Sequence, residues 1–153
     1  MAAKLVIGCD HAGFEMKEMI KKKFENKGYK FKDFGTYTLD SVDYPDIIHP
    51  LASSIDSGEY EIGIIICGSG NGVSMTANKY PDVRAALCWI DEIARMARLH
   101  NNANLIALPA RYISEEEAVN CVETFLTTGF EGGRHKRRVN KIAIEKSDKE
   151  CLK

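Results

Sequence analysis

Five short apolar runs divide this chain, and stretches with helical spacing separate them. The first, third and fifth runs are rich in Val, Ile and Leu, which is typical of strands buried on both faces, whereas the second alternates. They predict strands at residues 4–9, 30–35, 61–67, 84–89 and 104–109. Strands that alternate with helices form a parallel sheet covered on both faces, because right-handed crossovers carry each helix back over the sheet. We therefore expect a doubly wound, Rossmann-like α/β fold with a five-stranded parallel sheet.

The segments between these runs carry apolar residues at the spacing of helices. The pattern predicts helices from residue 14 to Gly28 and at residues 47–55, 73–80, 91–102 and 114–128. Ser114 and Glu117 have the spacing of a capping box. Pro50 is compatible with its helix only if it lies in the first turn. The length suits a single domain, which we expect at residues 1–143, followed by a tail at 144–153 that frays.

The charge of the chain argues against a polyanionic partner. Its 153 residues include 21 Lys and Arg against 22 Asp and Glu, for a formal net charge of -1. The first apolar run is short and is followed directly by Asp10 and His11, a pattern typical of neither a signal peptide nor a membrane span. The five cysteines form no CxxC pair, so the pattern predicts neither a disulfide framework nor a zinc site. We expect a cytoplasmic protein that binds neither nucleic acid nor membrane.

A cysteine directly before a glycine-rich loop is the main chemical signal. The third run ends in Cys67, and Gly68, Gly70 and Gly72 follow at alternate positions. Backbone N–H groups in such a loop are open to a negatively charged oxygen, and a helix N-terminus adds to their field. The same field favours a thiolate. A thiolate could take a proton from carbon while the N–H groups stabilise the enolate that forms.

Other interpretations of this loop remain open. Cys67 on its own is more typical of a buried structural cysteine, because a free cysteine behaves as a small hydrophobe. The glycines could mark only a tight turn or a nucleotide site. The loop does not satisfy GxGxxG, because Val73 occupies the last position. Asp91, however, follows the next strand, near the place where a dinucleotide-binding domain keeps its ribose-binding acid.

Two further polar clusters are expected at the same edge of the sheet. Residues 9–13 end the first strand with Asp10 and His11, and His100 with two asparagines closes the helix before the fifth strand. The run at 134–138 is basic. It could be a solvated surface, but Arg134 and Arg138 are four residues apart and would point the same way on a helix. With Arg111 after the fifth strand, they could bind one phosphate group.

Six motifs in this order resemble the type B ribose-5-phosphate isomerase family and the related galactose-6-phosphate isomerase subunits. The similarity runs from about residue 4 to residue 142. The motifs are GCDHAG at 8–13, DYPD at 43–46, CGSGNG at 67–72, ANK at 77–79, RLHNNAN at 98–104 and EGGRHKRRV at 131–139. The resemblance implies an aldose-ketose isomerase that needs no metal and no cofactor. It also implies a homodimer, with tetramers as a further option, in which two subunits share each active site.

The resemblance implies a role for each matching catalytic position. Cys67 would move a proton between C1 and C2 of the open-chain sugar through a cis-enediolate. Ser69 replaces the family's threonine and keeps its hydroxyl. His100, assisted by Asp10, would open the furanose ring. Some relatives use a glutamate later in the loop as the base. Residues 73–76 contain no acid here, so Cys67 must act as the base.

The resemblance also implies the residues that bind the substrate. Backbone N–H groups of the loop, namely those of Gly68, Gly70, Asn71 and Gly72 with Ser69, would meet the enediolate oxygens. Tyr44 and Asn101 would contact the sugar. The phosphate would be bound by His11, Arg111, Arg134 and Arg138, with His135 as a further member.

The leading expectation is the interconversion of D-ribose 5-phosphate and D-ribulose 5-phosphate, a step of the pentose phosphate pathway. A six-carbon substrate, galactose 6-phosphate or allose 6-phosphate, is an alternative within the same class. A nucleotide-binding module that uses the glycine loop and Asp91 is an alternative from another class. A purely structural domain is a third, and it would tolerate the loss of Cys67.

Overall fold

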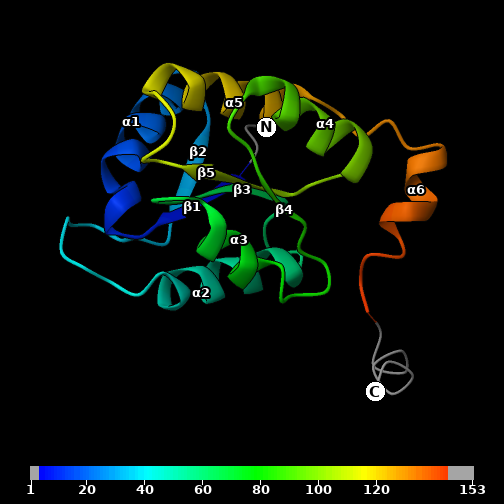
Figure 1. Ribbon diagram of the computed structural model, residues 1–153, viewed down its shortest axis with the longest axis horizontal. Helices are drawn as coiled ribbons and strands as arrows, with labels where there is room; N and C mark the ends of the chain where they lie inside the picture. Colours follow the sequence, from blue (N-terminus) through cyan, green and yellow to red (C-terminus); the bar gives the residue numbers. More distant parts are fainter. Residues whose placement is uncertain (1–3, 145–153) are drawn as a thin grey trace.

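The computed structural model describes residues 4–144 and shows one five-stranded parallel sheet with helices on both faces (Figure 1). The strand order is β2-β1-β3-β5-β4. The strands are β1 (Lys4–Cys9), β2 (Lys30–Asp33), β3 (Ile62–Cys67), β4 (Ala85–Leu87) and β5 (Leu105–Pro109). The helices are the 3-10 turn η1 (His11–Gly13), α1 (Phe14–Glu25), α2 (Tyr44–Asp56), α3 (Asn71–Ala77), α4 (Asp91–Asn101), α5 (Glu115–Thr127) and α6 (Arg134–Val139). The predicted fold class is confirmed.

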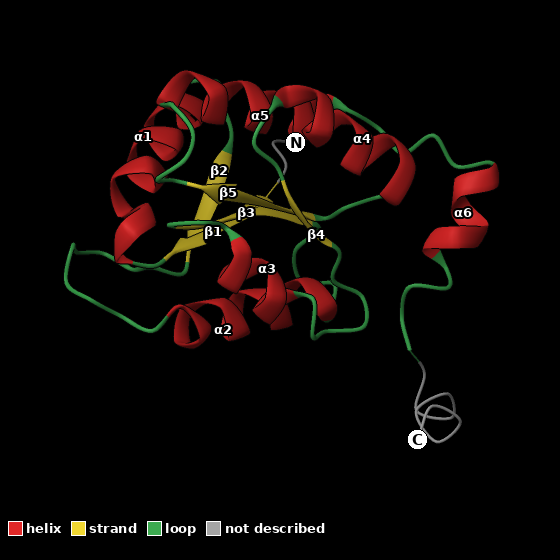
Figure 2. Cartoon of the chain, in the orientation of Figure 1, coloured by secondary structure: helices red, strands yellow, loops and turns green. Residues whose placement is uncertain are grey.

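Two helical layers enclose the sheet. Helices α1, α4 and α5 cover one face, and α2 and α3 cover the other (Figure 2). Each layer has its own apolar core, because the strands are buried on both sides: Ile64 and Ile66 face the first layer, and Ile65 faces the second. This explains why β1, β3 and β5 are continuous apolar runs, whereas the edge strand β2 alternates between exposed and half-buried residues.

The sheet reverses its winding between β1 and β3. The chain leaves β1 toward β2 on one side and continues from β3 toward β5 and β4 on the other. Cys9 pairs with Ile66 in this central register, and Cys67 pairs with Pro109 of β5. Parallel α/β sheets bind ligands outside the carboxyl ends of the strands at such a point. The ends of β1, β3 and β5 therefore mark the place to look for a site.

The helices differ from the expected ones in three places. Pro50 lies in the middle of α2 and not in its first turn, where Pro45 stands instead. The helix tolerates Pro50 because the apolar face around it is held in the core: Ile48, Leu51 and Ala52 are fully buried. Helix α3 begins at Asn71, within the glycine loop and earlier than expected. The basic run forms the short helix α6, which contacts α4 and stands apart from the sheet (Figure 1).

The capping box predicted at the start of α5 is confirmed. Ser114 accepts a hydrogen bond from the Glu117 N–H, and the Glu117 side chain accepts one from the Ser114 N–H. No helix within residues 4–144 is long and apolar enough to cross a membrane. The expected tail at 144–153 lies outside the described residues from residue 145 onward, and the expected domain boundary stays a prediction.

A buried lysine fixes the segment that follows β2. Lys17 of α1 is 0% exposed, and its ammonium donates to both carboxylate oxygens of Asp33, at 2.8 and 2.7 Å, and to the Thr36 carbonyl at 2.7 Å. The Thr36 N–H donates to the Cys9 carbonyl, and the Cys9 N–H donates to the Gly35 carbonyl. These bonds hold the start of the 34–43 segment against the carboxyl end of β1.

Candidate active site at the carboxyl ends of the strands

Cys67 stands at the end of β3, where the strand gives way to the glycine loop. Its side chain is 5% exposed and packs with Val73 and Ala107, yet it also lines a cavity at the sheet edge. The Gly70 N–H donates to the Cys67 sulfur at 3.2 Å. An N–H group aimed at sulfur stabilises negative charge there. The cysteine thus combines apolar packing with access to a polar cavity.

The loop shape depends on Gly70. Its φ of 74° lies in the left-handed region, and a Cβ there would stand 2.4 Å from Leu87 Cδ1. Both features require glycine. The Asn71 N–H donates to the Ser69 hydroxyl at 3.3 Å. Two of the loop's N–H groups are thus engaged inside the loop, whereas the sequence suggested that the loop N–H groups would all face the substrate.

The cavity at Cys67 is lined by polar groups that follow the ends of three strands. Its volume is about 310 Å³, and its lining consists of Asp10, Tyr44, Cys67, Gly68, Ser69, Gly72, Arg111 and Tyr112. A second cavity of about 560 Å³ shares four of these residues and extends toward His11 and the 41–46 segment. The two adjoining cavities are therefore lined by eight residues of the predicted set, which include a carboxylate, an imidazole, a thiol and a guanidinium.

Asp10 and His11 are held by backbone groups. Asp10 Oδ1 accepts from the N–H groups of Ala12 and Gly13, at 2.9 and 3.2 Å, as the cap of η1. The Val42 N–H donates to His11 Nδ1 at 3.2 Å. Nδ1 must therefore carry a lone pair, which places the ring proton on Nε2. His11 is a fixed N–H donor at the wall of the larger cavity.

Because Gly68 and Gly72 have no side chains, Arg111 and Tyr44 can pack directly against the loop. A Cβ on Gly68 would stand 3.1 Å from Arg111 Nη1, and one on Gly72 would stand 2.5 Å from the Tyr44 ring. The Arg111 N–H also donates to the Gly68 carbonyl at 3.0 Å. Arg111 and Tyr44 therefore lie directly against the loop, where side chains at these two positions would push them away.

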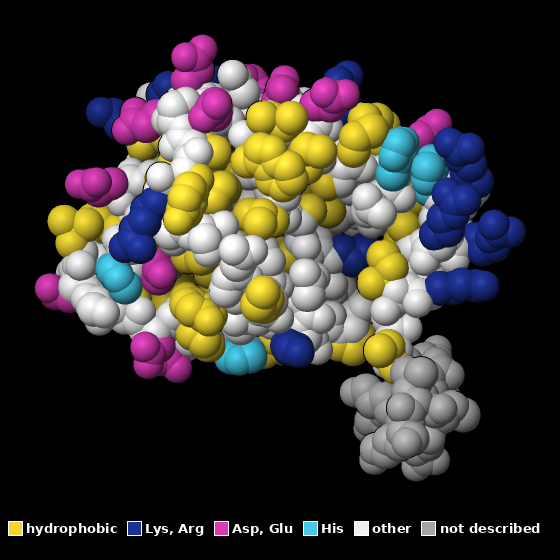
Figure 3. Space-filling model, viewed as in Figure 1, with side chains coloured by type: hydrophobic (Ala, Val, Ile, Leu, Met, Phe, Trp, Pro, Cys, Tyr) yellow, Lys and Arg dark blue, Asp and Glu magenta, His cyan; other side chains and the backbone are white. Residues whose placement is uncertain are grey.

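The remaining predicted residues form a second group at the far end of the molecule. His100 and Asn101 end α4, and Arg134 and Arg138 lie on α6; neither cavity described above is lined by any of them. Figure 3 shows dark blue Lys and Arg side chains gathered on the α6 side, with His side chains beside them. Within one chain, the predicted site is thus divided into two groups.

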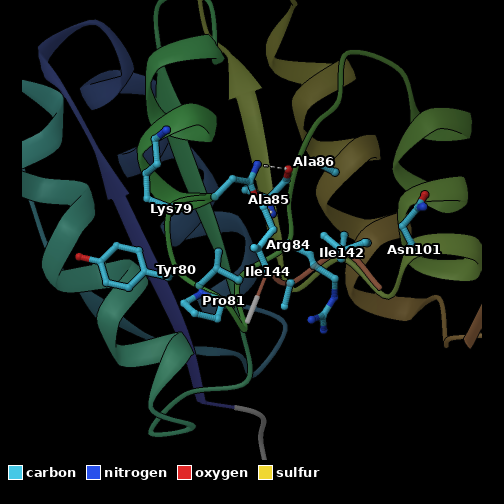
Figure 4. A pocket seen from close by; sticks show the side chains of 13 residues that line it. Lys79, Tyr80, Pro81, Arg84, Ala85, Ala86, Asn101, Ile142 and Ile144 are labelled. Atoms are coloured by element: carbon cyan, nitrogen blue, oxygen red, sulfur yellow. Dashed lines mark hydrogen bonds between the residues drawn. The ribbon is translucent and has the colours of Figure 1, made fainter. Parts of the chain in front are cut away.

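Asn101 faces a different hollow. It lines a groove of about 620 Å³ beside the edge strand β4, together with Arg84, Ile142 and Ile144 (Figure 4). This groove is mostly apolar along the segment that follows α6. In the described chain, Asn101 therefore cannot contact a ligand that sits against Cys67.

Two histidines and a glutamate form a compact cluster in the second group. The His100 and His135 rings stack with centroids 4.2 Å apart and planes 11° apart. Glu131 Oε2 lies 3.7 Å from His100 Nε2 and 3.6 Å from His135 Nε2. Burial lowers the pKa of His135 below its ordinary value, and the nearby His100 and Arg134 lower it further, against the opposing charge of Glu131.

The same three residues offer ligand atoms within 4.8 Å of one another, so they could in principle hold a metal ion. A metal lies close to the plane of each imidazole that binds it. Two nearly parallel rings cannot both point at one ion, so one ring would have to turn out of the stack first. The stacked arrangement suits hydrogen-bonded positioning better than metal binding.

The other described cysteines are chemically distinct from Cys67. Burial raises the pKa of Cys9 and of Cys88 to about 12 and that of Cys121 to about 11. All three are 0% exposed, so they are core thiols with little thiolate character. Cys151 lies outside the described residues.

Sequence reasoning missed several residues of the site. Tyr112 and Val42 line or close the cavities, and Glu131 joins the two histidines. Glu131 begins the EGGRHKRRV motif, but nothing in the spacing of the sequence shows that the chain folds this residue onto His100. His49 lies outside the site and pairs with the Tyr80 hydroxyl at 3.0 Å.

Nearly the whole described chain matches a known family. Residues 5–142 match the family model described as Ribose/Galactose Isomerase. The chain belongs to the ribose/galactose isomerase family. It is 38% identical over 143 residues to the ribose-5-phosphate isomerase B of Escherichia coli, which covers 93% of this chain and 96% of that protein.

Solved structures agree with this family in fold. A ribose 5-phosphate isomerase from Thermotoga maritima is 49% identical, with a TM-score of 0.91, over 94% of this chain and 99% of that one. The ribose-5-phosphate isomerase B of Mycoplasma genitalium with bound ribulose-5-phosphate is 38% identical, with a TM-score of 0.89, over 93% and 95%. The resemblance stated from the six motifs is therefore confirmed.

Proposed function

We propose that this chain interconverts D-ribose 5-phosphate and D-ribulose 5-phosphate, as an aldose-ketose isomerase of the ribose/galactose isomerase family. Family membership and the similarity to a relative crystallised with ribulose-5-phosphate support this substrate. The observation that carries the proposal is the position of Cys67: its sulfur receives the Gly70 N–H and lines a cavity with Asp10, Ser69 and Arg111.

Cys67 acts as the base that moves the proton between the two carbons. The thiolate removes the proton from C2 of the open-chain aldose, and the electrons move onto O1 to give a cis-enediolate. O1 gains a proton, O2 loses its proton to become the carbonyl oxygen of the ketose, and the Cys67 thiol returns a proton to C1. A proton next to a carbonyl is a weak acid, so the developing O⁻ needs fixed donors, each worth roughly 3 to 4 kcal/mol. The Ser69 hydroxyl and the free N–H groups of Gly68 and Gly72 fill this role.

The phosphate end of the sugar positions the reacting end. His11 presents its Nε2 proton and Arg111 its guanidinium at the same cavity wall, and both can donate to phosphate oxygens. Binding energy from this non-reacting group holds C1 and C2 against the sulfur. Tyr44 packs on Gly72 and closes the sugar site.

Two copies of the chain complete each site in this proposal. His100, Asn101, Arg134 and Arg138 lie away from the cavity of their own chain, and α6 stands out from the sheet (Figure 1). In a homodimer, these residues meet the cavity of the partner, add arginines to the phosphate and bring His100 to the sugar ring. Residues 1–143 are the isomerase domain of each copy, and the enzyme works in the cytoplasm in the pentose phosphate pathway.

A six-carbon sugar phosphate is the second candidate substrate, because the matching family includes galactose isomerases. Side-by-side assays on ribose 5-phosphate, galactose 6-phosphate and allose 6-phosphate separate the two. The nucleotide alternative loses its structural basis. Asp91 begins α4 after the edge strand β4, and β5 lies between β4 and the strand that carries the glycine loop.

The test of the function is isomerisation in D₂O. When the ketose returns to the aldose, the base delivers a proton that has exchanged with solvent. Recovered ribose 5-phosphate should therefore carry deuterium at C2, read by NMR or mass spectrometry. Active enzyme that returns ribose 5-phosphate without deuterium at C2 would contradict an exchanging cysteine base, and absence of turnover on ribose 5-phosphate would contradict the substrate.

A further inference from the structure

In the cluster of His100, Glu131 and His135, the proposed mechanism assigns no catalytic role to Glu131 or to His135. Glu131 had no assigned role, and His135 was expected only near the phosphate. Glu131 is exposed, whereas His135 is 7% exposed and lies under the ring of His100. The cluster therefore places an acid and a buried ring directly against the residue expected to open the sugar ring.

Backbone and side-chain hydrogen bonds hold the segment that carries Glu131 on the end of α4. The Glu131 N–H donates to the Leu99 carbonyl at 3.1 Å, one residue before His100. Arg98 donates to the Thr128 carbonyl at 3.1 Å and to the Ala103 carbonyl at 2.6 Å. The carboxylate of Glu131 is consequently kept beside His100 by contacts that involve neither histidine.

The geometry gives each ring a fixed relation to the carboxylate. Glu131 Oε2 lies almost equally far from the two Nε2 atoms, at 3.7 and 3.6 Å, which is an ion-pair distance and slightly longer than a hydrogen bond. Hydrogen bonds of catalytic groups often tighten only when substrate binds. A carboxylate at this distance favours a proton on Nε2 of His100 and leaves Nδ1 as the atom that can accept one.

We propose that Glu131 and His135 are positioning residues for ring opening: Glu131 fixes the proton on His100 Nε2, and the stacked His135 fixes the plane of the His100 ring. This inference rests on the proposed function. In the step it serves, the O1–H proton leaves to a base, the C1–O4 bond breaks, and O4 gains a proton as the C1 aldehyde forms. One proton is lost and one is gained, so no other reactant is needed.

The chemistry of the two substrates separates ring opening from proton transfer at carbon. Ribose 5-phosphate is a furanose that must open before C2 can react. Ribulose 5-phosphate cannot form a furanose, because its O5 carries the phosphate, so its C1 proton is available at once. Exchange of that C1 proton with D₂O thus reports on Cys67 and the loop without any contribution from ring opening.

The experiment measures both readouts on Glu131→Gln, His135→Ala and His135→Phe in the full-length enzyme. We expect Glu131→Gln and His135→Ala to lower kcat on ribose 5-phosphate by about tenfold or more, within the range of general acid-base effects. We expect C1 exchange of ribulose 5-phosphate to stay within about twofold of the wild type. His135→Phe keeps a stacking ring and should retain more turnover than His135→Ala.

Lys136→Gln is the matched control, because Lys136 is an exposed residue of the same helix outside the cluster. It should leave both readouts unchanged. Equal losses of both readouts in Glu131→Gln would show a general structural role and overturn the proposal, as would wild-type turnover in that variant. The wild-type enzyme decides the proposed function separately: if it supports neither turnover nor exchange, the function fails before any variant is considered.

Discussion

The cavity at Cys67 and the cluster at His100 are built in different ways. The cavity stands at the ends of three adjacent strands, where ladder hydrogen bonds and the Lys17 contacts fix the backbone. The His100 cluster joins the end of α4 to the segment before α6, far from the strand ends. The first region can hold reacting atoms rigidly in a single chain. The second exposes Glu131 and part of His100, where another molecule can meet them.

The largest expected effect comes from removing the base in the first region. Cys67→Ala should lower kcat for ribose 5-phosphate by about a thousandfold, because general base catalysis contributes 10²–10⁴-fold. Unlike the variants of the second region, it should also abolish C1 exchange of ribulose 5-phosphate. Steady-state kinetics and NMR exchange measure the two effects.

Cys121→Ala is the control for Cys67→Ala, since it removes a thiol from the apolar core of α5. It should fold less stably but keep its kcat. Circular dichroism should show that Cys67→Ala is folded. Nearly normal turnover in Cys67→Ala would mean that another group is the base. The proton transfer at carbon could then no longer be assigned to the cavity at Cys67.

An intermediate effect is expected from arginines in each region. Arg111→Ala and Arg134→Ala should each raise KM by about 10- to 100-fold, because a hydrogen bond to a charged group is worth about 1.5 to 3 kcal/mol. The value of kcat should change far less, since the phosphate is remote from the reacting carbons. Initial-rate kinetics over a range of ribose 5-phosphate concentrations measure both constants.

Arg137→Ala serves as the control for Arg134→Ala, because it is exposed on the same short helix and was not assigned to the phosphate. Its KM should match the wild type. If Arg134→Ala also matched the wild type while Arg111→Ala did not, the phosphate would be bound by the first region alone.

The smallest expected effect tests the support beneath the first region. Burial disfavours the Asp33 carboxylate, but hydrogen bonds from Lys17 and Lys21 outweigh it and lower the pKa of Asp33 below 3.8. A lowered pKa contributes stability above the unfolded pKa, and this contribution is lost as pH falls through the folded value. Asp33→Asn should lower the free energy of unfolding at neutral pH by about 2 kcal/mol, and this difference should shrink below pH 3.8.

Denaturant titrations at several pH values measure this difference. Asp40→Asn makes the same chemical change at an exposed position and should alter the free energy of unfolding little. A difference between wild type and Asp33→Asn that stays constant down to pH 2 would contradict the ionic role of Asp33.

The fold was predictable because its main features are local. Apolar runs such as Ile62–Cys67 identify the strands, and the Ser114 capping box fixes the start of α5. Pro50 shows the limit of local rules, since core packing holds the helix around it. The strand order was not predictable in detail, because periodicity does not show that β5 inserts between β3 and β4.

The two parts of the site differed in how far they could be predicted. Cys67, Asp10 and Arg111 follow strands that turned out to be neighbours, so the rule for parallel sheets brings them together. His100 lies in the last turn of α4 and Arg134 begins α6, and no such rule places the ends of helices. Glu131 was missed because its meaning depends on a contact across the chain, which the sequence does not show.

The most direct test of the central claim, that two chains supply the two regions of one site, is subunit mixing. Cys67→Ala and His100→Ala should each be nearly inactive on ribose 5-phosphate when prepared alone. Unfolded together in equal amounts and refolded, they should recover about a quarter of the activity of identically treated wild type, because half of randomly paired dimers are mixed and each mixed dimer has one intact site. Activity no higher than the mean of the two parents would contradict a site shared between chains.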